Sequence, residues 1–206
     1  MSAPVEILDE ALASVAPLLT ASGYTKSGRN YVAVGDGVAR VVQFQTSQLK
    51  KPEEASFTMN LLVTSVAFYE AFADAPFPKN AASAEPVISA GVGRLMPDGE
   101  AIWWSLDPRV SSALIAKEVG ALLQERALPF LARFTDEDAL LKELESPDAL
   151  PGFSAMRERC RAVLLAKRGR KAEAAKVLAA LVEANPGEGL EGFRDSVNEL
   201  ARRLGV

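Results

Sequence analysis

The chain has 206 residues, of which 49% are hydrophobic and 24% charged, and its formal net charge at pH 7 is −4. This composition is typical of a soluble globular protein, and the length favours one compact unit with an appendage over two full domains. Because histidine is absent and Cys160 is the single cysteine, the chain alone cannot form a Ser-His-Asp triad, a Cys-His dyad, a histidine-ligated zinc site or an internal disulfide.

The N-terminal residues predict one helix followed by a hairpin. Apolar residues at helical spacing predict an amphipathic helix over 5–22, which Gly23 ends. From Tyr24 the period changes to two, and "GDG" at 35–37 lies between "RNYVAV" and "VARVVQF" as a hairpin turn. The next segment, "ASFTMNLLVTS", predicts a third antiparallel strand whose core-facing residues are Phe57, Met59, Leu61 and Val63.

A second hairpin is expected further along the chain. After a short helix around 66–73, "EPVISAGVGRLM" and "AIWWSLD" are joined by the turn residues "PDGE". This hairpin would extend the sheet to about five strands. The predicted fold class is therefore α+β: an antiparallel sheet with helices packed on one face, followed by a C-terminal helical extension.

The helical period returns after Asp107. Residues 110–134 predict one long helix or two, since Pro129 lacks a backbone N–H. Thr135 is the expected N-cap of the next helix, with Asp138 three residues later. The turn-rich "SPDALPG" at 146–152 predicts a boundary between a domain of residues 1–150 and a helical tail of residues 151–206 packed on it. Helices are expected in the tail at 153–168, 171–184 and 189–204.

Four segments in order resemble a bacterial family. These are "GRNYVAVGDGVARVVQFQTSQ", "ASFTMNLLV", "GVGRLMPDGEAIWWSLD" and "LPFLARFTDEDALLKEL", and together they are similar to the domain of unknown function 4304 over roughly residues 5–145. The resemblance implies an α+β domain on an antiparallel sheet and no established activity. Residues 155–186 resemble one degenerate tetratricopeptide-like helix pair, which is open to a structural role or a peptide-binding groove.

The side chains on one sheet face are the candidate site. Gln43 and Gln45 point to one side of their strand while Val42 and Phe44 point to the other, and Thr58 and Asn60 behave likewise. Arg94 and one of the adjacent Trp103 and Trp104 are expected to join this face, since neighbouring strand residues point oppositely. The alternative is that the amides only keep a solvent-facing surface wet. The binding hypothesis therefore covers Gln43, Gln45, Thr58, Asn60, Arg94, Trp103 and Trp104.

Two classes of function remain open. The first is a cytoplasmic binding or protein-interaction module that uses the polar sheet face or the basic tail. The second is a small-ligand binder or an enzyme in which arginines 29, 40 or 94 hold an anion and Asp36, Asp98, Glu100 or Asp107 move protons. The first is preferred because no catalytic signature is present: there is no phosphate-binding loop, no EF-hand loop and no dinucleotide fingerprint.

Partners and location are predicted mainly from missing signals. No cofactor, metal site or catalytic residue is predicted, and a protein partner is possible. Basic residues outnumber acidic ones beyond residue 151, but with an overall pI near 5.1 and no interleaved aromatic residues, nucleic acid is not the expected partner. The N-terminus has no signal-peptide pattern, and no apolar run approaches the roughly 18 residues of a membrane span, which favours the cytoplasm. The oligomeric state is not predicted.

Overall fold

The computed structural model describes residues 4–47, 55–107, 109–146 and 151–206. The chain divides into two compact units. Unit 1 comprises Met1–Ala33, Arg40–Leu62 and Ser89–Ala132, and unit 2 comprises Val34–Ala39, Val63–Ile88 and Arg133–Val206. The boundary expected at 146–152 falls partly on residues 147–150, outside the described residues, so a division into residues 1–150 and 151–206 stays a prediction.

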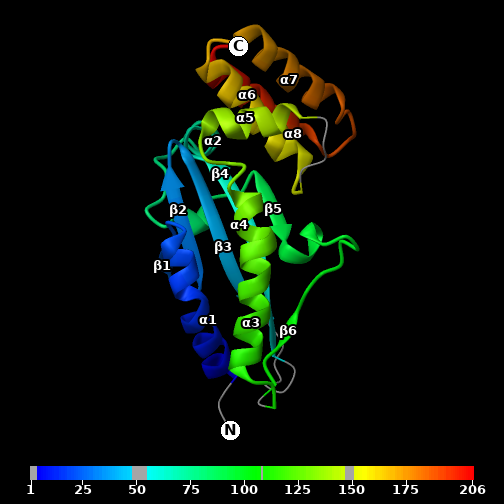
Figure 1. The fold of residues 1–206 in the computed structure, drawn as a ribbon. Coiled ribbons are helices and arrows are strands. Elements are labelled where there is room, and N and C mark those ends of the chain that lie inside the picture. The colour runs from blue at the N-terminus through cyan, green and yellow to red at the C-terminus, as the bar shows by residue number, and fades with distance from the viewer. Residues whose placement is uncertain (1–3, 48–54, 108, 147–150) are drawn as a thin grey trace. The chain divides into compact units, whose positions relative to one another are not determined.

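The fold is α+β, as the sequence predicts (Figure 1). Within the described ranges a six-stranded sheet has the order β1-β2-β3-β4-β5, and β6 also pairs with β4. The strands are β1 (Thr25–Ser27), β2 (Asn30–Gly35), β3 (Val38–Thr46), β4 (Ser56–Ser65), β5 (Ile88–Gly91) and β6 (Trp104–Ser105). The helices are α1 (Pro4–Ala21), α2 (Val66–Ala73), α3 (Ser112–Leu122), α4 (Leu128–Leu131), α5 (Glu137–Glu145), α6 (Ser154–Lys167), α7 (Lys171–Glu183) and α8 (Glu191–Leu204). Short helical turns are η2 (Ala81–Ser83), η3 (Val92–Leu95) and η4 (Leu123–Ala127).

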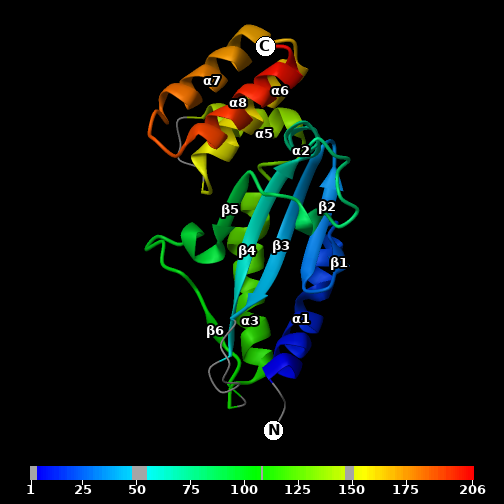
Figure 2. The same cartoon turned by 180° about the vertical axis from the view of Figure 1, so that it is seen from behind.

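Unit 1 has its core between one face of the strands and two helices. Helix α1 packs against α3, and the view from behind shows the strands in front of both helices (Figures 1 and 2). The predicted first helix is confirmed, and Gly23 follows it with φ of 84°. The predicted core strand residues are also confirmed as buried: Val42, Phe44, Phe57, Met59 and Leu61.

The first predicted hairpin is present in the structure. Strand β2 ends at Gly35 and β3 begins at Val38. Asp36 and Gly37 between them have φ of 48° and 80°, the consecutive left-handed conformations that a tight hairpin turn needs. An aspartate and a glycine tolerate these angles better than most residues, so the local sequence alone predicts this turn.

The second predicted hairpin is wrong. Strands β5 and β6 both pair with β4. Phe57 of β4 pairs with Trp104 of β6, and Val87, just before β5, donates its N–H to the Val63 carbonyl at 2.8 Å. As the chain advances from β5 to β6, the residue that it meets on β4 therefore moves from Val63 back to Phe57. The two short strands form one edge strand that residues 92–103 interrupt.

The segment that interrupts the edge strand contains the predicted "PDGE" turn. The Gly99 N–H bonds to the Met96 carbonyl at 3.0 Å, and Gly99 has φ of 67°. Before this turn, residues 92–95 form the short helix η3 instead of continuing the strand. The turn chemistry was predicted correctly, but it folds an excursion from the sheet edge and not the tip of a hairpin. We call residues 92–103 the edge loop.

The segment 110–134, predicted as one long helix or two, is helical through Pro129 with a change of pitch. Helix α3 runs into the π-helical turn η4 and then into α4, where Pro129 lies in the first turn. A proline ring clashes with the carbonyl four residues earlier and donates no hydrogen bond. A wider π turn just before the proline accommodates both effects, so the chain needs no break there.

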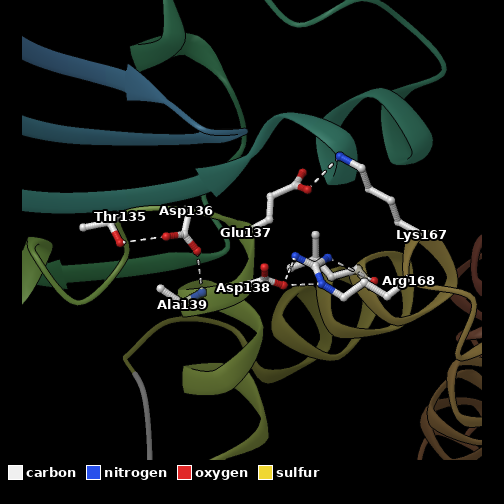
Figure 3. Close-up of polar contacts among 8 residues, drawn as sticks. Thr135, Asp136, Glu137, Asp138, Ala139, Lys167 and Arg168 are labelled. Atoms are coloured by element: carbon white, nitrogen blue, oxygen red, sulfur yellow. Dashed lines mark hydrogen bonds and ion pairs between the residues drawn. The ribbon is translucent and has the colours of Figure 1, made fainter.

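The N-cap of α5 is Asp136, so the prediction of Thr135 was wrong by one residue. The Asp136 carboxylate accepts the Ala139 N–H at 2.8 Å, and the Thr135 hydroxyl donates to the same carboxylate at 3.1 Å (Figure 3). The bond from Ala139 lowers the pKa of Asp136, because it favours the charged form. A carboxylate is a stronger acceptor than a hydroxyl, so it takes the cap position while the threonine supports it.

The helical tail lies in unit 2 and forms α6, α7 and α8 close to the predicted ranges. Helix α6 packs against α7, α5 and α2, and α8 packs against α7 and α2. Within unit 2 the tail helices thus share one core with two helices that precede residue 150. Cys160 is buried in this core, and burial raises the pKa of its thiol well above the usual value.

Candidate functional site

Three amides on β3 and β4 form a hydrogen-bonded cluster on the polar sheet face. Strand alternation places Gln43 and Gln45 on the side opposite Phe44, and Asn60 lies beside them on β4. The Asn60 Nδ2 donates to Gln43 Oε1 at 3.3 Å and to Gln45 Oε1 at 2.8 Å. These bonds fix the orientation of all three amides and use the acceptor oxygens of both glutamines.

The edge loop is held at this face by Thr58 and by a close approach of its own backbone. The Thr58 hydroxyl donates to the Ile102 carbonyl at 2.8 Å. Inside the loop, a Cβ on Gly93 would lie 1.8 Å from the Glu100 carbonyl oxygen and 3.0 Å from the Ile102 nitrogen. Only a glycine lets the two arms of the loop pass so closely. Gly93 is therefore a requirement of the loop conformation.

A pocket of about 440 Å³ lies where the edge loop meets the polar face. Strands β3 and β4 supply one wall and the edge loop supplies the other. The residues that line it are Gln45, Thr58, Asn60, Gly91, Arg94, Gly99, Ala101, Ile102 and Trp103. The sequence predicts a polar sheet face, and the loop turns part of that face into a concave site.

Arg94 brings the positive charge of this lining. Its side chain is exposed, and one guanidinium nitrogen lies 4.0 Å from the position that a Cβ on Gly99 would take. Glu100 and Asp107 follow Arg94 in the sequence and are the candidate internal partners for its guanidinium. Asp107 instead pairs with Arg109, whose hydrogen bonds lower the pKa of the Asp107 carboxyl to about 2. Among the described residues, neither an acid nor a carbonyl bonds the Arg94 guanidinium.

The two tryptophans point to opposite sides. Trp104 is buried, stacks on Phe57 with ring centroids 5.0 Å apart, and donates its indole N–H to Glu118 of α3 at 3.2 Å. Trp103 lines the pocket and is 50% exposed. The hydrogen bond to Glu118 explains which ring turns inward, since a buried indole N–H needs an acceptor.

The structure brings together six of the seven predicted site residues. Gln45, Thr58, Asn60, Arg94 and Trp103 line the pocket, and Gln43 joins through its bond to Asn60. Trp104 lies apart, on the helix-covered side. Sequence reasoning missed the backbone-rich part of the lining, which comprises Gly91, Gly99, Ala101 and Ile102. The two glycines and the "PDGE" turn were visible signals of a loop, but the segment was assigned to strands.

The other groups weighed for catalysis lie outside the pocket. Arg29 pairs with Asp9 at 3.4 Å, and the Asp98 carboxylate accepts the Glu100 N–H at 3.3 Å. Asp36 occupies the β2–β3 turn. Among the described lining residues Arg94 is the one ionisable side chain, and the part of the chain that the structure describes contains no cluster of acidic or cysteine side chains that fits a metal ion.

The basic side chains of the tail are largely engaged with acids of unit 2. Lys167 bonds Glu137 at 2.6 Å, and Arg168 bonds Asp138 (Figure 3). A second group of ion pairs joins Arg161 to Glu158 and Arg170 to Glu145 and Glu173. These pairs reduce the positive surface that an acidic partner would meet. No helix in the described part of the chain is long and apolar enough to cross a membrane.

The comparisons with known proteins identify a family without a known activity. The chain matches the family described as Domain of unknown function (DUF4304) over residues 15–133, which is more than half of its length. The matched range contains every residue that lines the pocket. No curated protein and no solved structure matches the chain. The resemblance inferred from the four sequence segments is therefore confirmed, and the chain belongs to the DUF4304 family.

Proposed function

We propose that this protein is a binding protein and that the pocket between the edge loop and the polar sheet face holds a small ligand. The observation that carries the proposal is the joint presence in one concavity of a guanidinium that no described residue engages, at Arg94, and a half-exposed indole, at Trp103. Ligand sites are typically concave, about 300–1,000 Å³ in volume, and contain a few polar groups among apolar ones. A volume of about 440 Å³ falls within that range.

Binding is favoured over catalysis because the described part of the lining contains no acid-base pair. Proton transfer needs a group that titrates near the working pH, and the lining residues that the structure describes include neither a carboxylate nor a lysine, tyrosine or cysteine. The Thr58 hydroxyl is the available nucleophile, but it donates its proton to the Ile102 carbonyl and not to a base. The lining therefore offers recognition groups and lacks the parts of a reaction.

A small ligand is favoured over a protein partner by the concave shape of the site. Protein partners usually meet larger and flatter surfaces, and the basic tail that could attract one is mostly neutralised by ion pairs. A cytoplasmic, bacterial setting is part of the proposal. It is supported by the single cysteine, which rules out a disulfide within the chain, and by the resemblance of the four sequence segments to a bacterial family.

The proposal is tested by filling the pocket. Gly91 has φ of −64° and ψ of 143°, angles that any residue adopts, and a Cβ there would make an ordinary contact of 3.8 Å with Asn60. Gly91→Leu should therefore occupy the pocket without backbone strain. Gly192→Leu, at an exposed position of α8 with nothing within 4 Å, is the matched control. A set of small aromatic fragments is titrated into both variants and the wild type, and amide and indole NMR signals are followed.

We expect fragments to shift the Trp103 indole signal together with the side-chain amides of Gln45 and Asn60. These shifts should vanish in Gly91→Leu and persist in Gly192→Leu. The buried Trp104 indole, which is bonded to Glu118, is an internal reference whose NMR signal should not shift. Fragment binding that survives in Gly91→Leu, or that maps to other residues, would refute the pocket as the site.

A further inference from the structure

The internal hydrogen bonds of the pocket determine which groups are left for a ligand. Asn60 donates to the oxygens of Gln43 and Gln45, so the NH₂ group of Gln45 remains as a donor at the lining. Thr58 uses its proton on Ile102 and retains its oxygen as an acceptor. Arg94 adds a guanidinium that no described residue engages. The strongest unused groups are therefore donors.

The described lining residues carry a single positive charge. Arg94 supplies it, and no acidic side chain among the described lining residues opposes it. A guanidinium presents two parallel N–H groups that match the two oxygens of a carboxylate. A phosphate monoester carries up to two negative charges, and one arginine with neutral amides would leave part of that charge unbalanced. One guanidinium with an amide donor matches a monocarboxylate better.

The same lining offers an aromatic surface. Trp103 is 50% exposed, and Ala101 and Ile102 beside it add small apolar area. Exposed indole rings at recognition sites typically stack on flat apolar groups. Gly91 and Gly99 contribute no side chains, so they leave room for a ring between the loop and the strand.

From these groups we propose that the ligand is a small monocarboxylic acid with a flat apolar group, whose carboxylate is held by Arg94 and Gln45 and whose apolar group lies on Trp103. This inference rests on the proposed function, because it names the ligand class of the same pocket. It goes further in requiring a negative head group. A ligand with a neutral or positive head group would leave the Arg94 guanidinium without a partner.

Three probes of the same shape test the head group. Phenylacetate, phenylacetamide and phenethylammonium each present one phenyl ring and differ in charge. They are titrated separately at constant ionic strength, and dissociation constants are taken from the Trp103 indole shift. Phenylacetate should bind at least tenfold more tightly than phenylacetamide, and phenethylammonium should not saturate. Phenyl phosphate is added as a dianionic comparison and should bind more weakly than phenylacetate.

Two substitutions connect the preference to Arg94. Arg94→Ala should weaken phenylacetate at least tenfold and leave phenylacetamide within about twofold, so that the two probes become equivalent. Arg126→Ala removes the same charge from an exposed position of η4 outside the pocket and should leave all affinities unchanged. Arg94→Lys should give an intermediate affinity for phenylacetate, because it keeps the charge but loses the paired N–H groups.

The outcomes separate this inference from the proposed function. If phenylacetamide binds as tightly as phenylacetate, or if only phenethylammonium or phenyl phosphate saturates, the monocarboxylate is overturned while the pocket remains a binding site. If phenylacetate binds tightly but Arg94→Ala has no effect, the assignment of Arg94 is overturned. If neither these probes nor the wider fragment set shifts the Trp103 signal, both the ligand class and the site are overturned.

Discussion

Arg94 of unit 1 and Arg159 of unit 2 show two opposite uses of a guanidinium. Arg159 is only 5% exposed and lies over the rings of Phe72 and Phe193, at 5.2 and 4.6 Å from their centroids. It donates to the Ser196 hydroxyl at 2.6 Å, and burial lowers its pKa. Arg94 is exposed beside a pocket and has no such partners in the described chain. The protein itself surrounds the Arg159 guanidinium and bonds one of its terminal nitrogens, although the buried Nε has no hydrogen-bond partner, whereas no described residue engages Arg94.

Two glycines show the same contrast in the backbone. Gly93 lets the arms of the edge loop approach each other and so maintains the pocket wall. Gly37 lets the β2–β3 turn pack against the Glu137 side chain, where a Cβ would lie 2.8 Å from the carboxyl carbon. The first contact shapes a surface that is open to solvent, and the second holds a half-buried turn against the buried Glu137 side chain of unit 2. Substitutions in the two regions should therefore separate binding from stability.

The largest effect is expected from Gly93→Ala. The added methyl would lie 1.8 Å from the Glu100 carbonyl oxygen, so residues 100–102 must move and the Thr58 bond to Ile102 is lost. We expect the free energy of unfolding to fall by about 3 kcal/mol and fragment binding to disappear. Urea denaturation and the Trp103 titration measure the two effects. Gly192→Ala, with open space around it, is the control and should not destabilise the protein. Wild-type stability of Gly93→Ala would show that the loop is not held as described.

Arg159→Ala should give the next largest effect, and only on stability. Truncation removes a buried side chain whose guanidinium lies over Phe72 and Phe193, which we expect to lower the free energy of unfolding by about 2 kcal/mol. Arg159→Met keeps most of that volume and should cost less than about 1 kcal/mol. Urea denaturation of both variants checks this, and fragment affinity should stay at the wild-type value. If methionine costs as much as alanine, the charge stabilises the core and the stem does not.

The sequence alone was sufficient to predict the features of the site that depend on a local pattern of residues. Strand alternation alone placed Gln43, Gln45 and Asn60 on one face and Phe44 on the other. It also predicted that one of two adjacent tryptophans is exposed, although the choice of Trp103 depends on the bond from Trp104 to Glu118, far along the chain. The polar face could therefore be predicted from the sequence. Once the side chains that face the core are known, the alternation along a strand determines which side chains face the other way.

The edge loop was not predictable in the same way. "VISAGVGRLM" is rich in β-branched and small residues and reads as a strand. What prevents it from continuing as one is a close backbone contact between Gly93 and residues 100–102, which no local propensity records. The pocket exists because of that contact. The concave shape of the site, unlike its chemical groups, therefore had to come from the structure.

Gly37→Ala is expected to have a moderate effect that can be divided into two parts. A φ of 80° strains any residue with a Cβ, and the contact with Glu137 adds a steric term. Together they should lower the free energy of unfolding by about 1.5 kcal/mol. In a Glu137→Ala background the steric term is removed and about 1 kcal/mol of backbone strain should remain. Urea denaturation of the four proteins in this cycle gives both values. Equal costs in both backgrounds would show that Glu137 yields freely to the new methyl.

The smallest effect on stability is expected from Arg94→Ala, and this small value is the most informative. An exposed arginine that no described residue engages should change the free energy of unfolding by less than about 0.5 kcal/mol. The competing hypothesis pairs Arg94 with Glu100 or Asp107 as part of the fold, and it predicts a drop in stability with any loss of binding following from it. Urea denaturation and the phenylacetate titration on this one variant, beside Arg126→Ala, separate the two. Unchanged stability with lost phenylacetate binding assigns Arg94 to the ligand. A side chain that recognition needs and folding does not need must find its partner outside the chain. A destabilised Arg94→Ala whose binding loss only parallels its unfolded fraction would place Arg94 with Arg159 among the residues that hold the fold.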